Sequence, residues 1–575
     1  MQRTLIALSL TLSLAACAAK VVPATAGFDQ LSAQIWQQEQ LLSDRSATRL
    51  PDMSPEALEK KQQKRLHLLE QLQQVDQNSL NEQQAINYQI LVYELQDAID
   101  EYRFGAHYMP LTSESGFHSS LGFMASGTEF SSVKSYQDYL TKLASVPRYM
   151  QQQTDWMRKG IDKGFTQPKA VLTGYEQSIQ AYISETPEQS IFYRPFKKKP
   201  QFIADADWTS FEQQAKALIA QQINPAYQQF YDFFVGTYRP SARDEIGANA
   251  LPQGEAFYQN RLEHYTTLKM TPQQVHQLGL QEVARIKAEM QQVIDQVGFK
   301  GSFADFIEFL RTDPQFYAKT ATDLLKEASF IAKKADAELP KLFKTLPRQP
   351  YGVAPVPAEI APKYTSGRYS GRGRADSAGF YWVNTYALNR RPLYELEALT
   401  LHEAVPGHHL QIALAAEMTE QPDYRRNFYT SAFGEGWGLY SEFLGLEMGF
   451  YQDPYSNFGR LTYEMWRACR LVVDTGMHTM GWSRQQALDY LGSHTALSMH
   501  NVTTEIDRYI SWPAQALSYK LGEITIKKLR NQAEQQLGDK FNVRDFHEAV
   551  LKNGSVPLSQ LELQVTQYIE QAGKA

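Results

Sequence analysis

A proline and a glycine in the middle of a helical segment constrain this fold more than any other feature of the sequence. The segment RRPLYELEALTLHEAVPGHHLQIALAAEM, residues 390–418, has helical character on both sides of Pro406 and Gly407. Proline inside a helix removes a backbone hydrogen bond and clashes with the preceding turn, which costs roughly 3 kcal/mol or more. A neighbouring glycine adds about 1 kcal/mol. A metal ion that needs a kink or bulge at this point could offset the cost.

Histidines lie on both sides of this interruption. His402 and Glu403 begin like the H-E-x-x-H helix of zinc peptidases, but the fourth residue after His402 is Pro406. On a regular helix His402 and His408 would lie roughly 120° apart, and His402 and His409 roughly 10 Å apart along the axis. A bulge that loops out two residues brings His408 into the second ligand position, and a bulge of three brings in His409. We favour His408 and keep both as candidates.

A second cluster, SAFGEGWGLYSEFLGLE at residues 431–447, offers the carboxylate that two histidines would need. Glu435 and Glu442 are seven residues apart and so share one helix face. Gly434 and Gly436 flank Glu435 and would let another backbone approach closely. A catalytic zinc site has three protein ligands and one open position. We therefore predict Glu435 as the third ligand, Glu442 as a supporting carboxylate, and Glu403 as the general base.

HEAVPGHHLQ followed by GEGWGLYSE resembles the bacterial "domain of unknown function 885" family, which is grouped with the gluzincin-type zinc peptidases. The resemblance covers residues 345–575 and is sharpest in LEALTLHEAVPGHHLQ, GEGWGLY, VVDTGMH and RYISWPAQALSYKLGE. It implies a large multi-helix fold with a deep cleft, distantly similar to angiotensin-converting enzyme and thimet oligopeptidase. It also implies one Zn²⁺ per chain, with His402 and Glu435 as ligands, His408 or His409 as the third, and Glu403 as the base.

Other polar side chains of this part are candidates for catalysis. Asp474 and His478 are one helical turn apart in VVDTGMH. Asp474 could orient a ligand histidine, and His478 could stabilise the oxyanion. Tyr509 and Tyr519 could give electrophilic help to a tetrahedral intermediate.

Four cations are candidates for binding a substrate carboxylate, because guanidinium groups pair with carboxylates in a bidentate manner. They are Arg467, Arg470, Arg508 and Lys520. The run GFYWVNTY, residues 379–386, could present a strand edge to an extended peptide through main-chain hydrogen bonds.

The N-terminus reads MQRTLIALSLTLSLAACAAK. Arg3 precedes an apolar run at residues 5–14 that is too short to span a bilayer, which is typical of a secretory signal. The ending L-A-A-C resembles a bacterial lipobox, and we predict a signal peptide at residues 1–17 with lipidation at Cys17. By resemblance to Gram-negative sorting rules, Ala18 favours the periplasmic face of the outer membrane over retention at the inner membrane.

Periodicity along the rest of the chain predicts a mainly α fold with a small antiparallel sheet. We expect a helical lobe at residues 18–344, beginning with a helical hairpin at 28–104, and a metal-binding part of the same fold at 345–575. Thr271 and Pro272 predict the start of a helix. Cys469, the one cysteine left after Cys17, is expected to be buried.

The net charge of −6 and the isolated KKK at residues 197–199 argue against a nucleic-acid partner. The sequence therefore predicts a lipid-anchored zinc hydrolase of the cell envelope that acts on short peptides. Two rival hypotheses are a non-catalytic lipoprotein that binds metal or peptide, and a zinc amidase or esterase with a non-peptide substrate.

Overall fold

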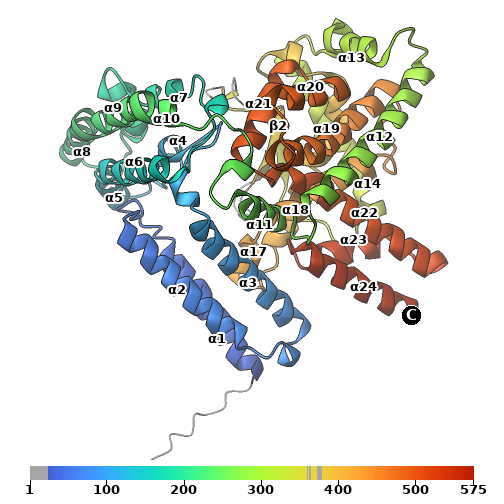
Figure 1. The fold of residues 1–575 in the computed structure, drawn as a ribbon, viewed down its shortest axis with the longest axis horizontal. Coiled ribbons are helices and arrows are strands. Elements are labelled where there is room, and N and C mark those ends of the chain that lie inside the picture. The colour runs from blue at the N-terminus through green and yellow to red at the C-terminus, as the bar shows by residue number, and fades with distance from the viewer. Residues whose placement is uncertain (1–23, 359, 362–363, 372–377, 575) are drawn as a thin grey trace, which may run out of the picture.

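The computed structural model describes residues 24–574 except 359, 362–363 and 372–377. The predicted signal peptide and Cys17 lie outside the described residues. The described part is mainly helical with one small sheet, as predicted (Figure 1). Among the described helices, none combines the length and the apolar character that crossing a bilayer requires.

The chain begins with three helices that lie side by side (Figure 1). They are α1 (Ala24–Leu42), α2 (Pro55–Gln73) and α3 (Glu82–Arg103). The predicted hairpin is present as α2 and α3, with α1 as an additional helix beside them. Leu68, Leu72 and Ile90 are fully buried, so the apolar stripes read from the sequence face a core.

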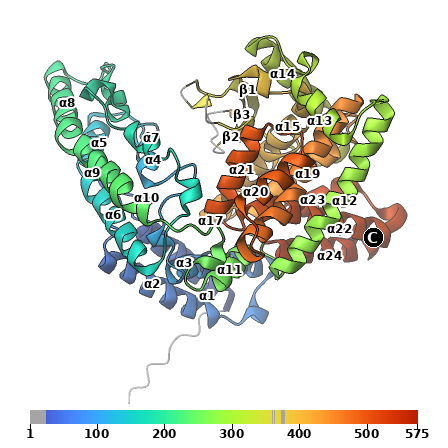
Figure 2. The ribbon, with the colours of Figure 1, turned by 45° about the horizontal axis from the view of Figure 1, so that its top comes forward.

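The next helices form an arm that spreads away from the C-terminal part in Figure 2. They are α4 (Phe117–Leu121), α5 (Val133–Leu143), α6 (Val146–Lys163), α7 (Glu176–Gln180), α8 (Asp205–Leu218), α9 (Asn224–Phe233) and α10 (Arg239–Ser241). Short π-helical stretches, Ile219–Ile223 and Phe234–Tyr238, flank α9. α4 is a single turn.

Four helices then lead back toward the sheet: α11 (Gly254–Thr266), α12 (Pro272–Val297), α13 (Phe303–Thr312) and α14 (Ala321–Leu342). The predicted start of α12 is confirmed by its cap. The Thr271 hydroxyl accepts a hydrogen bond from the Gln274 amide at 3.2 Å, and the Gln274 side chain accepts one from the Thr271 amide at 2.9 Å.

The sheet contains β1 (Tyr351–Pro355), β2 (Gly367–Ser370) and β3 (Gly379–Val383) in the order β1-β3-β2. β3 pairs with β2 in the antiparallel sense and with β1 in the parallel sense, so the sheet is mixed instead of antiparallel. β3 is the central strand. The expectation that GFYWV offers a free edge is therefore wrong, because both of its sides are already paired; β2 is an edge strand beside α15 (Leu396–Glu403).

The remaining helices make up the C-terminal part. They are α16 (His408–Ala416), α17 (Asp423–Asn427), α18 (Ser431–Leu444), α19 (Pro454–Thr479), α20 (Arg484–His494), α21 (Met499–Ser511), α22 (Ser518–Leu537), α23 (Val543–Leu551) and α24 (Leu558–Lys574). α19 is buried along most of its length, including its charged residues. Cys469 on this helix is a buried free thiol, as predicted, and burial raises its pKa.

Glycines allow the closest helix contacts. α12 packs along α19, where a Cβ on Gly279 would lie 2.7 Å from the Leu471 Cβ. α18 crosses α22 where a Cβ on Gly436 would lie 2.6 Å from the Gly522 Cα. This bears out the expectation that glycine beside Glu435 admits a second backbone.

The two large cores join residues from both sides of position 344. One combines residues of α5–α9 with residues of α19–α21, and the other combines residues of α1–α3 with residues of α22–α24. The hydrophobic packing does not follow the division into 18–344 and 345–575. The assignment of metal binding to 345–575 therefore stays a prediction.

Candidate metal centre

The proline and glycine end one helix and start another. α15 stops at Glu403, and the backbone leaves the helical region at Ala404, whose ψ is −114°. The Val405–Pro406 peptide bond is cis, and α16 begins directly after Gly407. The Gly407 amide donates to the Leu401 carbonyl at 3.0 Å, and the Trp437 indole donates to the Pro406 carbonyl at 2.8 Å. The interruption is therefore a defined turn between two helices, held by hydrogen bonds from α15 and α18.

This turn brings His402, His408 and Glu435 together. One ligand atom from each lies within 4.8 Å of the other two. Glu435 Oε2 is 3.5 Å from His402 Nε2 and 3.4 Å from His408 Nε2. Tetrahedral zinc with bonds of about 2.0–2.2 Å places its ligand atoms about 3.4 Å apart. The spacing and the two-nitrogen, one-oxygen donor set therefore fit a zinc ion.

The other nitrogen of His402 is also held. His402 Nδ1 lies 2.7 Å from Glu442 Oε1, which in turn lies 3.7 Å from Arg467 Nη2. A carboxylate on Nδ1 fixes the orientation of the ring and leaves the Nε2 lone pair for a metal. Glu442, predicted as a supporting carboxylate, lies where that role requires.

The charges around this cluster favour a cation. Burial opposes the charge on Glu435, but His408 and His402 outweigh it and lower the pKa of this carboxyl well below its usual value. Burial likewise opposes a charged His402, but hydrogen bonds to Glu435 and Glu442 raise its pKa to about 9, with a further contribution from Glu403. Three carboxylates thus surround two imidazoles.

One carboxylate oxygen of Glu403 is fixed by a hydrogen bond from the sheet. Its Oε2 accepts a hydrogen bond of 2.7 Å from the backbone amide of Tyr369, on the edge strand β2. Only 9% of Glu403 is exposed, and its charge acts on His402. The residue predicted as general base is therefore a buried carboxylate beside the cluster, with one oxygen fixed by the sheet.

A glycine on α18 leaves room for a candidate ligand. A Cβ at Gly438 would lie 2.6 Å from His402 Cε1 and 2.7 Å from Nε2, closer than real Cβ contacts allow. Hydrogen at this position therefore lets the His402 ring pack flat against α18.

His409 is not part of the cluster. Its Nδ1 lies 3.0 Å from the Tyr369 hydroxyl, and its ring packs on the Tyr351 ring at a centroid distance of 4.6 Å. Burial lowers the pKa of His409 to about 4. Of the two candidates kept open, His408 joins the cluster and His409 faces the sheet, because the turn starts α16 at His408 and not one residue later.

Tyr429 lies beside the cluster and carried no signal in the sequence analysis. Its hydroxyl donates to Glu435 Oε1 at 3.3 Å, and 46% of the residue is exposed. A Cβ on Gly434 would collide with the Tyr429 ring. The glycine before Glu435 was the available clue, since it marks a close approach, but it did not identify the approaching group.

His478 and Asp474 do not have the roles predicted for them. Both nitrogens of the fully buried His478 ring are engaged: the Ala248 amide donates to Nδ1 at 2.9 Å, and Nε2 lies 3.0 Å from the Tyr509 carbonyl oxygen. Asp474 Oδ1 accepts hydrogen bonds from Tyr258 and Ala514, at 2.6 and 3.2 Å, instead of from a ligand histidine. Because both ring nitrogens are hydrogen-bonded to the backbone, His478 has no free donor for an oxyanion.

Tyr509, Arg470 and Arg508 belong to one buried hydrogen-bonded group with Glu505. The Tyr509 hydroxyl donates to Glu505 at 2.5 Å and accepts from Arg470 Nε at 2.7 Å. Arg470 and Arg508 also contact Glu505, at 3.0 and 3.3 Å. The electrophilic role predicted for Tyr509 is wrong, because this hydroxyl is already used inside the protein. Tyr519 is half-buried, and the guanidinium carbon of Arg470 lies 4.2 Å from the centre of the Tyr519 ring. The role of Tyr519 stays a prediction.

Lys520 and Arg467 are also held by partners within the protein. Lys520 Nζ lies 2.5–3.1 Å from the carboxylates of Glu523, Glu464 and Glu282 and is 1% exposed. Three carboxylates leave it no capacity for a substrate carboxylate, so that prediction is wrong. The guanidinium carbon of Arg467 lies 4.3 Å from the centre of the Trp466 ring, and its Nη2 lies 3.7 Å from Glu442 Oε1.

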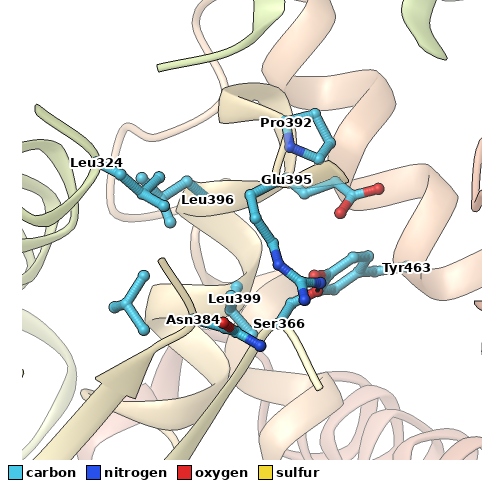
Figure 3. Close-up of a pocket in the computed structure, with 10 residues that line it drawn as sticks. Leu324, Ser366, Asn384, Pro392, Glu395, Leu396, Leu399 and Tyr463 are labelled. Atoms are coloured by element: carbon cyan, nitrogen blue, oxygen red, sulfur yellow. Dashed lines mark hydrogen bonds between the residues drawn. The ribbon is translucent and has the colours of Figure 1, made fainter. Parts of the chain in front are cut away.

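A small cavity of about 20 Å³ lies between α15, the sheet and α19 (Figure 3). Glu395, Asn384 and Tyr463 are among its lining residues. Burial raises the pKa of Glu395 to about 7 despite the opposing charges of Arg391 and Arg467. The volume suits about one water molecule. None of the three clustered residues lines it, so it is separate from the candidate centre.

A family model described as "Bacterial protein of unknown function (DUF885)" matches residues 37–565. Among curated proteins, none matches the chain.

Two solved structures share the fold. A crystal structure described as that of a candidate lipoprotein from Colwellia psychrerythraea has a TM-score of 0.88 and 28% sequence identity, covering 96% of this chain and 100% of its own. A candidate lipoprotein of unknown function from Shewanella oneidensis has a TM-score of 0.75 and 17% identity, covering 94% of this chain and 99% of its own. The second likeness is one of fold alone.

Proposed function

This chain belongs to the DUF885 family, and we propose that it is a zinc-dependent hydrolase that cleaves short peptides in the cell envelope. One observation carries the proposal: the ligand atoms of His402, His408 and Glu435 converge within 4.8 Å, and the charge of the buried Glu403 acts on His402. A purely structural zinc site has four protein ligands and needs no adjacent base.

His402, His408 and Glu435 would hold the ion, which supplies Lewis acidity and activates a water molecule. Glu403 would act as the general base, taking a proton from the attacking water and returning it to the leaving amine. Glu442 keeps the His402 ring in place, and the Tyr429 hydroxyl steadies the Glu435 carboxylate from its other oxygen.

The peptide substrate is supported by the edge strand. The Tyr369 amide on β2 is directed at Glu403 and away from β3, so this edge of the sheet runs beside the base. Because Glu403 already uses the Tyr369 amide, an extended peptide could pair through its main chain only with the part of this edge that Glu403 does not occupy.

The cell-envelope location is supported by the LAAC sequence ending at Cys17 and by the description of the Colwellia relative as a candidate lipoprotein. We propose that a lipid on Cys17 anchors the chain to the periplasmic face of the outer membrane. Replacing Cys17 by Ser should move the protein from the membrane fraction to the soluble fraction, and continued membrane association of this variant would contradict the anchor.

The first test is the metal content of the chain beginning at Ala18, measured by elemental mass spectrometry after zinc loading. We expect one zinc per chain in the wild type, in Glu403→Gln and in His409→Ala. We expect loss of zinc in His402→Ala, His408→Ala and Glu435→Ala. A wild-type protein without stoichiometric zinc would contradict the proposal.

Turnover is tested on a short-peptide library beside panels of amides and esters. Glu403→Gln should keep its zinc and lose a factor of about 10²–10⁴ in kcat, as removal of a general base does. Equal turnover in this variant would exclude Glu403 as the base. Cleavage of only the amide or ester panel would favour the rival amidase or esterase, and binding without turnover the rival binding lipoprotein.

A further inference from the structure

The two adjacent histidines of the motif contact different parts of the molecule. His408 faces Glu435 across 3.4 Å, whereas His409 lies 1% exposed against the sheet. The His409 ring makes a hydrogen bond to the backbone of Gln349, just before β1, and its Nδ1 meets the Tyr369 hydroxyl at 3.0 Å. His409 therefore links α16 to two segments of the sheet region.

Tyr369 completes a path from His409 to the base. Its hydroxyl contacts His409, while its backbone amide donates to Glu403 Oε2 at 2.7 Å. Glu403 ends α15 and His409 is the second residue of α16, so Tyr369 spans the turn between the two helices from the outside. Two buried hydrogen bonds, both made by Tyr369, thus connect His409 with Glu403.

The position of the Tyr369 hydroxyl is enforced by its surroundings. A Cβ on Gly379 or on Gly371 would collide with this hydroxyl. Tyr369 is 7% exposed, and its ring packs on the His409 ring at a centroid distance of 5.3 Å. The two glycines leave room for the phenol at this place, and there its hydroxyl meets Nδ1 of His409.

We propose that Tyr369 and His409 are positioning residues that fix the carboxylate of Glu403 for its work as general base. The inference rests on the proposed function, because it assigns a purpose to the contact with Glu403. A general base needs one oxygen for the proton, and holding the other oxygen sets the direction of the first. A misplacement of about 1 Å in such a group can cost about 100-fold in rate.

The kinetic test compares Tyr369→Phe, His409→Leu and the double variant with the wild type on a cleaved peptide. Each single change should lower kcat about tenfold with KM and zinc content unchanged. The double variant should be no slower than either single variant, because both remove the same hydrogen bond. His409→Asn keeps an acceptor near the position of Nδ1 and should recover most of the rate, which a loss of packing alone would not explain. Tyr386→Phe, at an exposed position after β3, is the matched control and should be neutral.

Amide hydrogen exchange at residue 369 gives a readout that needs no turnover. Its protection should fall at least tenfold in His409→Leu and stay at the wild-type level in His409→Asn and Tyr386→Phe. Wild-type protection and wild-type kcat in His409→Leu would overturn the inference. An inactive or zinc-free wild type would contradict the proposed function instead, and the exchange result would still report whether His409 and Tyr369 hold Glu403.

Discussion

At the scale of single residues, the partners of a buried histidine decide whether its pKa is raised or lowered. His402 has two carboxylates on its ring, which raise its pKa to about 9 against the effect of burial. His478 is also buried, but its two ring nitrogens are hydrogen-bonded to backbone groups, and desolvation lowers its pKa to about 4. The same residue type is therefore a candidate ligand in one place and a neutral brace between α19 and α21 in the other.

The neutral state of His478 predicts a loss of stability in acid. Its pKa is lower in the folded chain than the usual value of 6.5, so below that value the unfolded chain binds the proton first. This contribution is fully present above pH 6.5 and is lost as the pH falls toward 4. Between pH 7.5 and 5.0 the free energy of unfolding should fall by about 2 kcal/mol less in His478→Gln than in the wild type.

Urea unfolding at the two pH values measures this difference, and the other buried histidines cancel in the comparison. His67→Gln is the control, because the His67 side chain is 59% exposed. An identical pH dependence in wild type and His478→Gln would show that His478 is not kept neutral by burial.

Much of the candidate centre could be predicted from residue types and spacing. Zinc chemistry needs the groups of His402, His408 and Glu435, and the structure brings these three residues together. The wrong choices His478, Asp474, Tyr509 and Lys520 share one cause. Each is a polar residue that a buried helix uses to satisfy a distant segment, and such a partner cannot be read from local sequence.

At the scale of elements, the turn between α15 and α16 determines which residues face the cluster. Consecutive residues on one helix point about 100° apart, so a regular helix could not direct His402 and His408 at one carboxylate. The turn ends α15 and starts α16 in a new direction. The hydrogen bond from Trp437 connects the turn to α18, which carries Glu435.

Gly407→Ala should disrupt this turn. A Cβ at this position would collide with the His402 carbonyl oxygen, and the clash involves backbone that cannot move away. We expect a loss of about 2–3 kcal/mol in the free energy of unfolding together with a loss of zinc affinity. Thermal unfolding and zinc titration measure the two effects.

Gly236→Ala is the control for that substitution, because a Cβ there meets no atom within 4 Å. Alanine at this helical position should change stability by less than about 1 kcal/mol, and in the favourable direction. A Gly407→Ala protein as stable and as zinc-competent as the wild type would show that the turn is not required.

Helix positions were largely predictable, because apolar periodicity and caps are local signals; Thr271 and α12 are an example. The sheet was predicted only in part. The position of β3 could be read from GFYWV, but its parallel partner β1 precedes it by more than twenty residues, and pairing over that distance leaves no local pattern.

At the scale of the whole molecule, buried charges hold three long helices together. Lys520 on α22 pairs with Glu282 on α12, Glu464 on α19 and Glu523 on α22 itself. Arg285 on α12 joins the same group through Glu464. The group connects helices on both sides of residue 344, in keeping with the shared cores.

Lys520→Met should therefore act on stability and not on substrate binding. Removing one partner of a buried ion pair leaves an uncompensated charge, which costs about 3–5 kcal/mol. Denaturant unfolding measures this loss. Lys528→Met on the same helix is the control, since the Lys528 side chain is 70% exposed, and should cost less than about 0.5 kcal/mol. A raised KM with unchanged stability in Lys520→Met would restore the role first predicted for Lys520.

The core that surrounds α1–α3 extends from Phe28 to Ile569, and this also sets an order in time. A chain is synthesised from its N-terminus, so α1–α3 are made long before α22–α24 exist to complete the core that they share. Contacts across such separations form late. This core would thus be completed only when the last helices are present, and a stop codon or protease cut near the C-terminus would leave it incomplete.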